Sequence, residues 1–315
     1  MPGGRRPIFV QIDIRAPLAR VWEMTQNPDL HRRWDLRFTD IRYLPRPDPA
    51  APQRFRYATR IGFGLHVSGQ GETVGELAGP AGQRTSALRF WSDDPKSLIR
   101  DGSGYWKYAP APDDAPGDRP AVRFLTAYDY QTRFAAAGRL IDRLVFRPLI
   151  GWATAWSFDR LRLWVEGGVD PADAMRRSLI HAASRTALAF VWLYQGIVPK
   201  LIFRHRDELA MLRDAGLSDA AARLVRGGMG WAEVALGLVL LVAWRARWPL
   251  WLTLAAMPVA TLGVSLASPA FLVAAFNPIA LNLCVFALAG VGLLAGGNDL
   301  PSARHCVRRP PREGA

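Results

Sequence analysis

Long apolar segments dominate the last third of the chain. Residues 186–203 and 227–244 are mostly apolar, and residues 248–298 contain no Asp, Glu, Lys or Arg. A helix needs about 20 predominantly apolar residues to cross a bilayer, so the last segment is long enough for two crossings. The pattern predicts an all-α bundle of four transmembrane helices within residues 183–297.

The first part of the chain alternates between apolar and polar positions. Arg54, Arg56 and Arg60 are interleaved with apolar residues, and residues 8–15 and 122–130 follow the same period of two. This period is typical of strands that turn one face toward a core. The sequence therefore predicts several strands of an antiparallel sheet before residue 135.

Two stretches have the spacing of helices. Residues 18–34 are interrupted by Asn27 and Pro28, which predicts two short helices. Residues 136–166 predict one long helix with a kink at Pro148. Its apolar stripe, which we expect to cover the sheet, consists of Leu140, Leu144, Trp152, Trp156 and Leu163. Together with the strands, these helices predict an α+β domain.

The chain is strongly basic, with 40 Lys and Arg against 27 Asp and Glu and a net charge of +13. It has no basic run with interleaved aromatic residues, so we expect no nucleic-acid partner. In a membrane protein, an excess of Arg is explained by attraction to anionic lipid and by the positive-inside rule. Cys284 and Cys306 have neither the number nor the spacing of a disulfide framework or a metal site.

Loop charges predict the orientation. The N-terminal segment lacks an apolar region of signal-peptide length, so we expect the first domain in the cytoplasm and the spans in the inner membrane. The connection with Arg245 and Arg247 and the C-terminal tail then also lie in the cytoplasm, as the rule favours. The basic residues of the tail are Arg304, Arg308, Arg309 and Arg312. The connection at 204–226 would lie outside although it is basic, and its leucines favour short interfacial helices.

The residues of the first span resemble a known family. The stretch FVWLYQGIVPKLIFRHRDELAML, residues 190–212, is similar to the first span and following loop of the DoxX-like membrane family. Four spans, a Glu in the second, and Asn277, Pro278 and Asn282 in the fourth fit the same family. The resemblance covers about residues 180–297.

The first domain resembles the SRPBCC, or START-like, helix-grip fold. The match lies in the element order: a strand, two short helices, an antiparallel sheet, and one long C-terminal helix. The segment FRPLIGWATAWSFDRLRLW in that helix also contributes. The resulting organisation is a helix-grip domain at 6–168, a linker at 169–182, a four-span domain at 183–297 and a basic tail at 298–315. A Pro- and Gly-rich stretch at 109–120 predicts an exposed hairpin loop.

The two resemblances imply functions. Helix-grip domains usually enclose an apolar cavity and bind lipids, sterols, polyketides or other hydrophobic molecules. Some DoxX-like relatives are linked to thiosulfate:quinone oxidoreduction or to membrane redox complexes. The resemblance therefore implies the bilayer and a hydrophobic small molecule as partners. The residues themselves indicate no cofactor, and the resemblance adds a quinone and a membrane redox partner as candidates.

Aromatic residues of the first domain are the candidates to line such a cavity. They are Trp22, Trp34, Phe90, Trp106, Tyr128, Trp152 and Trp156. Ordinary core packing explains most of them equally well one by one. Together, an aromatic-rich helix over a sheet favours a hydrophobic pocket.

Polar residues inside the spans form a second candidate site. Glu233 lies in the second span, where an ionisable group costs about 2.5–3.5 kcal/mol and usually has a partner. Gly230 and Gly237 share its face and would allow a helix to approach closely, and Lys200 is the predicted partner. The pair is either a proton-relay or ligand site or a structural ion pair. The predicted set is Tyr194, Gln195, Lys200, Glu233, Asn277 and Asn282.

The sequence contains no catalytic triad, phosphate-binding loop or dinucleotide fingerprint, and its histidines lack the spacing of metal ligands. We therefore predict no catalytic and no metal residue. The leading hypothesis is a multi-pass bacterial membrane protein with a cytoplasmic domain that binds a hydrophobic ligand. The alternatives are a subunit of a quinone-linked membrane oxidoreductase and a membrane scaffold or assembly protein.

Overall fold

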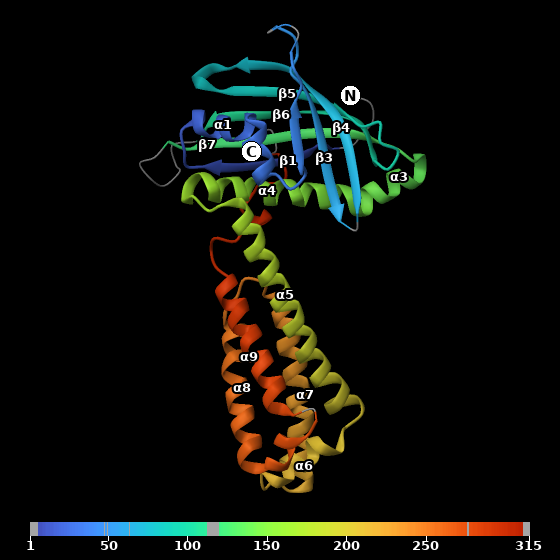
Figure 1. Cartoon of the computed structure of the whole chain (residues 1–315), viewed down its shortest axis with the longest axis vertical. Coiled ribbons are helices and arrows are strands. Elements are labelled where there is room, and N and C mark those ends of the chain that lie inside the picture. Colours follow the sequence, from blue (N-terminus) through green and yellow to red (C-terminus); the bar gives the residue numbers. More distant parts are fainter. Residues whose placement is uncertain are drawn as a thin grey trace. The chain divides into compact units, whose positions relative to one another are not determined.

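The computed structural model describes residues 6–310 except 47, 49, 63, 112–119 and 276. Most of the predicted loop at 109–120 and Arg312 of the tail lie outside the described residues. The chain forms two compact units: Met1–Ala174 together with Pro301–Ala315, and Met175–Leu300 (Figure 1). The tail thus belongs to the first unit.

The described part of the first unit contains a seven-stranded antiparallel sheet. Its strands are β1 (Ile8–Ile14), β2 (Asp40–Tyr43), β3 (Arg54–Gly62), β4 (Leu65–Ala78), β5 (Arg84–Trp91), β6 (Ile99–Pro110) and β7 (Val122–Thr132). They lie in the order β1-β7-β6-β5-β4-β3-β2. The arginines at 54, 56 and 60 are exposed while Phe55 and Tyr57 are partly buried, so the predicted alternation in β3 is confirmed.

Two short helices follow β1, as predicted. They are α1 (Leu18–Gln26) and α2 (Pro28–Trp34). The chain breaks between them at Asn27, whose side chain accepts a hydrogen bond from the backbone N–H of Asp29, and Pro28 begins α2. Proline fits there because the first helical N–H has no partner within the helix.

One long helical segment follows β7. It consists of α3 (Ala135–Ile141), a π-helical turn at Asp142–Phe146 and α4 (Arg147–Gly167). The π-helical turn lies just before Pro148, which stands in the first turn of α4, where its missing N–H is tolerated. A strand, two helices, six further strands and a long helix make up the helix-grip fold, so the predicted fold class is confirmed.

The apolar stripe predicted for this helix is wrong at three positions. Leu140, Leu144 and Trp152 are 58%, 65% and 44% exposed. The positions that face the domain are held instead by other residues, including the fully buried Asp142 and Phe158. Helical spacing identifies an apolar face but cannot say what covers it.

One residue of the tail pairs with the edge strand β1. Val307 and Gln11 exchange two backbone hydrogen bonds of 2.9 Å. The buried carboxylate of Asp159 on α4 accepts a hydrogen bond of 2.7 Å from the backbone N–H of Ser302 and lies 2.8 Å from Nδ1 of His305. These contacts fix residues 302–307 to the helix-grip domain.

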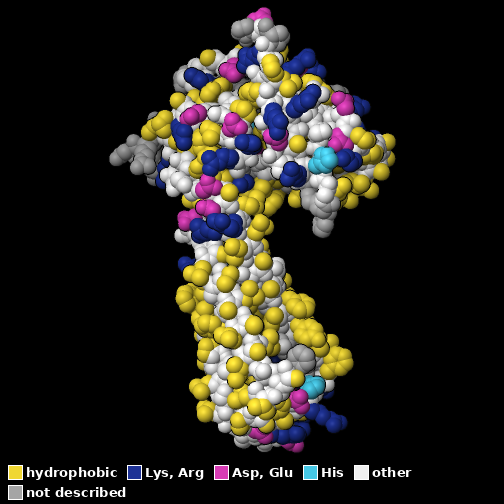
Figure 2. Space-filling model, viewed as in Figure 1, with side chains coloured by type: hydrophobic (Ala, Val, Ile, Leu, Met, Phe, Trp, Pro, Cys, Tyr) yellow, Lys and Arg dark blue, Asp and Glu magenta, His cyan; other side chains and the backbone are white. Residues whose placement is uncertain are grey.

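The second unit consists of long helices. They are α5 (Pro171–Gln195), which continues in a π-helical segment at Gly196–Ile202, α6 (Arg206–Asp214), α7 (Asp219–Val242), α8 (Trp248–Ala267) and α9 (Pro278–Ala295), with a 3-10 segment at Pro269–Val273. Most of the predicted linker is therefore the start of α5. Hydrophobic side chains cover much of the visible surface, and charged ones gather near α6 (Figures 1 and 2).

Within the described residues, α7, α8 and α9 are long and apolar enough to cross a membrane. A fourth candidate is the segment Pro171–Ile202 with α6, which bends by 91° at the break between them. The connection predicted at 204–226 is mostly helical, since it contains α6 and the first turns of α7.

Glycines allow the end of α5 and the π-helical segment that continues it to approach α7 closely. A Cβ atom on Gly196 would lie 2.6 Å from the carbonyl oxygen of Gly230, and one on Gly237 would lie 2.7 Å from Cγ of Leu193. The predicted role of Gly230 and Gly237 in close helix approach is confirmed.

Candidate functional site

The inner face of the sheet carries aromatic rings that lie over glycines. Gly71 stands opposite Phe55, Gly69 opposite Tyr57, and Gly102 opposite Phe90. A Cβ atom on Gly102 would lie only 2.5 Å from Cζ of Phe90, and the other two glycines are equally close to their rings. Each glycine therefore leaves room for a ring over the sheet, which a larger residue would push away.

Burial differs between the two ends of this inner face. Tyr108 and Phe124, on β6 and β7, are fully buried, and the ring of Phe124 stacks on Phe158 of α4 at 4.4 Å. On β3 to β5, Phe55, Tyr57 and Phe90 are only partly buried. One end of the sheet is thus filled by the protein core, while the other presents rings that the protein does not fully cover.

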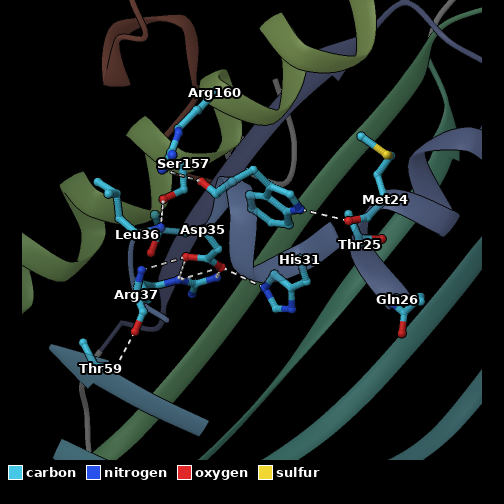
Figure 3. A network of polar contacts seen from close by, with 12 residues as sticks. Met24, Thr25, Gln26, His31, Asp35, Leu36, Arg37, Thr59, Ser157 and Arg160 are labelled. Atoms are coloured by element: carbon cyan, nitrogen blue, oxygen red, sulfur yellow. Dashed lines mark hydrogen bonds and ion pairs between the residues drawn. The ribbon is translucent and has the colours of Figure 1, made fainter. Parts of the chain in front are cut away.

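A buried ionic cluster lies in the same domain (Figure 3). Asp35, which ends α2, is 1% exposed. Its carboxylate accepts hydrogen bonds from Nε and Nη2 of Arg37 at 2.9 and 2.6 Å, and Oδ2 lies 3.0 Å from Nε2 of His31. Figure 3 also shows Leu36, whose backbone N–H donates to Ser157 of α4. The cluster thus ties the end of α2 to the long helix.

The protonation states in this cluster follow from burial and charge. Burial lowers the pKa of His31 against the opposing effect of Asp35, which favours the neutral imidazole. Burial alone would raise the pKa of Asp35, but the Arg37 charge and the hydrogen bonds from His31 and Arg37 outweigh it and hold the pKa far below its ordinary range. The cluster is therefore a carboxylate–guanidinium pair with a neutral histidine beside it.

Aromatic rings surround the histidine of the cluster. The ring of His31 lies 5.0 Å from that of Trp34, 5.3 Å from Phe38 and 4.9 Å from Trp106, between centroids. The guanidinium carbon of Arg37 lies 5.5 Å from the ring centre of Tyr128. His31, Asp35 and Arg37 were not predicted as a cluster, because polar residues in and just after a short helix are usually solvated. The helical spacing of His31 and Trp34 was the one available signal.

The predicted cavity residues fall into three groups. Trp34, Trp106, Tyr128 and Trp156 are buried. Phe90 is partly buried on the inner face, and Trp22 of α1 is partly buried against the ring of Tyr108 at 5.0 Å. Trp152 is exposed. The structure thus brings Trp34, Trp106 and Tyr128 to the ionic cluster, while Phe90 belongs to the partly covered rings.

In the second unit, Lys200 joins two carboxylates. Its Nζ lies 3.1 Å from Oε2 of Glu233 and 3.2 Å from Oε1 of Glu208. Lys200 is buried, and the contact with Glu233 is an ion pair without hydrogen-bond geometry. The structure forms the predicted pair and adds Glu208 of α6. Sequence reasoning missed Glu208 because it assigned this residue to an exposed connection.

The other predicted intramembrane residues do not converge on this pair. Nδ2 of Asn282 donates to Oγ1 of Thr261 on α8 at 3.0 Å, which is a hydrogen bond between helices. Asn277 caps its own helix α9 by accepting from the backbone N–H of Ala280. Tyr194 is exposed, with its ring 5.8 Å from that of Phe190, and Gln195 is partly buried.

A fully buried arginine on α5 was not predicted. Arg185 donates to the backbone carbonyls of Leu240, Ala243 and Ala246 at 3.0, 2.8 and 2.9 Å. It therefore binds carbonyl groups at the end of α7 and in the turn that follows it, where the helix leaves acceptors free. The residue was missed because it lies just before the apolar segment at 186–203.

Metal binding has no visible site in the described part of the chain. Among these residues, no group of three or more His, Cys, Asp or Glu side chains is arranged to hold a metal ion.

Comparison with solved structures gives weak likenesses of the first unit. The Zhui aromatase/cyclase from Streptomyces sp. R1128 is 14% identical, with a TM-score of 0.37, over 52% of this chain and 98% of that one. The lipid transfer and protein localization domain of human StarD13 is 10% identical, with a TM-score of 0.34, over 53% of this chain and 80% of that one.

Comparison of sequences identifies the second unit. The model of the DoxX-like family matches residues 189–290. The uncharacterized membrane protein YndG of Bacillus subtilis (strain 168) is 50% identical over 192 residues, which are 61% of this chain and 69% of the relative. The region that the family model matches begins within α5 and ends within α9. The chain is a membrane protein that belongs to the DoxX-like family and carries a helix-grip domain before its membrane helices.

Proposed function

We propose that this protein binds a hydrophobic small molecule in its helix-grip domain while its DoxX-like helices hold the domain at the membrane. The observation that carries the proposal is the set of partly buried rings over glycines on β3 to β5. Apolar side chains that the protein core does not cover fully gain free energy when a ligand covers them, at about 25 cal/mol per Å². Flat rings favour an acyl chain or a ring system such as a lipid, a quinone or a polyketide-like molecule.

The ionic cluster supports binding over catalysis. Asp35 and Arg37 satisfy each other, so a ligand does not need to bring a charge into the domain. His31 is held neutral and packs against aromatic rings rather than against a nucleophile. We infer that the cluster fixes the end of α2 and gives the binding region a polar boundary.

We also propose four membrane crossings, with the helix-grip domain in the cytoplasm. The chain leaves the first unit after Ala174 and rejoins it at Pro301. A chain that leaves and rejoins one domain on one side of a bilayer crosses it an even number of times. This supports counting α5, with its π-helical continuation, as a span beside α7, α8 and α9. Arg245 and Arg247 lie on the same side as the domain in this arrangement, which favours the cytoplasm.

Ligand binding is tested with the full chain in detergent. Native mass spectrometry should find a hydrophobic molecule retained from the membrane, and titration with a fluorescent fatty acid and a short-chain quinone should saturate. Leu88 faces inward on β5 and Arg89 outward. Leu88→Trp should abolish binding in a folded domain, while Arg89→Trp should preserve it. No retained molecule and no saturable binding in the wild type would refute the proposal.

A second candidate function is favoured by the Lys200 cluster. Two carboxylates share one ammonium group at a π-helical segment that contains Pro199, and such segments are frequent at functional sites. We propose that Glu233 and Glu208 exchange a proton in a quinone-linked reaction. Membranes with the wild-type chain, supplied with thiosulfate as electron donor, should then oxidise two thiosulfates to tetrathionate and reduce the quinone to the quinol with two protons, and Glu233→Gln should lower the rate. Unchanged activity in that variant would remove this candidate.

A further inference from the structure

Apolar side chains cover the outer face of the helical segment that follows β7. We define the outer apolar face as Leu140, Ile141, Leu144, Val145, Leu149 and Trp152, which are 44% to 65% exposed. They recur at spacings of three and four residues along α3, the π-helical turn and α4, so they form one continuous stripe. Figure 2 shows hydrophobic side chains gathered near α3. A continuous apolar patch on a domain surface marks an interaction site.

Polar anchors on the opposite side prevent this stripe from turning inward. The fully buried Asp142 accepts a hydrogen bond of 2.6 Å from the hydroxyl of Tyr130. Nη2 of Arg147 donates to Oδ1 of Asp129 at 3.0 Å. A Cβ atom on Gly138 would collide with the backbone of Arg133, so the start of the segment is also closely packed. The outer apolar face is therefore a fixed feature of the fold.

We propose that the outer apolar face docks on the surface of an anionic lipid bilayer. The chain is a membrane protein, and its membrane helices keep the helix-grip domain near lipid. A weak contact is therefore sufficient for docking. Exposed Arg139 and Arg143 flank the stripe, and the acidic residue of this stretch, Asp142, is buried. Apolar and Trp side chains on one face with Arg beside them are typical of helices that lie in the membrane interface.

Charge and composition favour lipid over a second copy of the chain. A second copy would bring the same arginines against Arg139 and Arg143, and no exposed acidic side chain lies between residues 133 and 152, all of which the structure describes. Anionic headgroups neutralise these arginines, while their aliphatic stems stay on the apolar surface. This inference stands apart from ligand binding, since it uses the outer side of the helix.

The test places a fluorescent label on the full chain in lipid nanodiscs. In a background with Cys284→Ala and Cys306→Ala, an environment-sensitive dye is attached through Leu144→Cys. The matched control is Leu77→Cys, since Leu77 on β4 is 72% exposed and lies on another element. Spin-labelled lipids should quench the dye at 144 several-fold more strongly than the dye at 77, with a blue shift of its emission.

The lipid composition and a second variant sharpen the test. Quenching at 144 should be stronger with phosphatidylglycerol than with phosphatidylcholine alone, and Leu149→Asp should reduce it. A dye at 144 that stays in water in both lipids would overturn the proposal. Equal quenching in both lipids would overturn the anionic part of it. A dye that is shielded already in detergent, together with a doubled particle mass, would assign the face to a second copy instead.

Discussion

The two side-chain oxygens of Asp35 are both held by Arg37, with Nε 2.9 Å from Oδ1 and Nη2 2.6 Å from Oδ2. The carboxylate is buried, so its charge depends on this partner. Removing one member of a buried pair costs about 3–5 kcal/mol, whereas removing both costs less. The relationship between these two residues therefore determines which substitutions the domain tolerates.

Arg37→Met should destabilise the helix-grip domain strongly, because it leaves Asp35 as an unpaired buried charge. The double variant Arg37→Met with Asp35→Asn should recover part of the loss. Hydrogen exchange of β6 and β7 peptides in the full chain, followed by mass spectrometry, measures this local stability. Equal protection in the single variant and the wild type would contradict the prediction.

The stability of the same domain should fall at mildly acidic pH. The pKa of His31 is below its ordinary value of 6.5 in the folded chain, because burial favours the neutral ring. As the pH drops through about 6.5, the unfolded chain binds more protons than the folded chain. The stability that comes from the buried neutral His31 is therefore complete above that pH and is lost below it. The charged groups that face the ring are Asp35 and Arg37.

Hydrogen exchange at pH 7.5 and pH 5.5, corrected for intrinsic rates, checks this dependence. His31→Gln should make the stability of the domain less dependent on pH in this interval. Because the pKa of Asp35 is also lowered, a second loss should begin as the pH falls below its ordinary value of 3.8. Identical pH profiles for the wild type and His31→Gln would count against the buried neutral histidine.

Gly196→Ala should destabilise the membrane unit, and Gly228→Ala should not. A methyl group on Gly196 would meet the backbone of Gly230 at 2.6 Å, whereas no atom lies within 4 Å of the corresponding position on Gly228. We expect a cost of about 1–3 kcal/mol for the first variant, which is typical of overpacking. Thermal unfolding in detergent measures the difference, and equal melting temperatures would show that the helices can separate freely there.

Lys200→Met should cost more stability than Glu233→Gln. The first variant leaves Glu208 and Glu233 beside each other without the ammonium group that both contact, while the second keeps the pair of Lys200 and Glu208. Two carboxylates that share one site repel each other unless one takes up a proton. Thermal unfolding in detergent measures the difference, with Glu208→Gln as the matched variant. A larger loss of stability in Glu233→Gln than in Lys200→Met would contradict the shared role of Lys200.

Patterns of period two predicted β1, β3, β5 and β7, and long apolar segments predicted α7, α8 and α9. β3 shows this, because its exposed arginines alternate along the strand with the partly buried rings of Phe55 and Tyr57. Leu140, Leu144 and Trp152 of the outer apolar face were predicted to cover the sheet, since helical spacing alone does not distinguish a core from another apolar environment. Its assignment needed the burial of Asp142 and Phe158 on the opposite side.

The candidate sites were harder to predict because they depend on residues distant in the sequence. Lys200 and Glu233 were paired from their positions in two spans, but Glu208 comes from a helix that folds back after a 91° bend. Arg185 was passed over because its partners are carbonyl groups, which every residue has. Side-chain pairs can be proposed from residue types, while contacts with the backbone require the fold.

The pairing of Gln11 with Val307 has a consequence for biogenesis. β1 leaves the ribosome before the membrane helices, whereas Val307, which pairs with Gln11 at its free edge, is translated after them. Throughout insertion, the edge of β1 therefore keeps unpaired N–H and C=O groups, which are a template for pairing with other chains. Docking of the tail adds the two hydrogen bonds at Gln11 last, so protection of the Gln11 amide against hydrogen exchange marks a molecule whose membrane helices have all been synthesised.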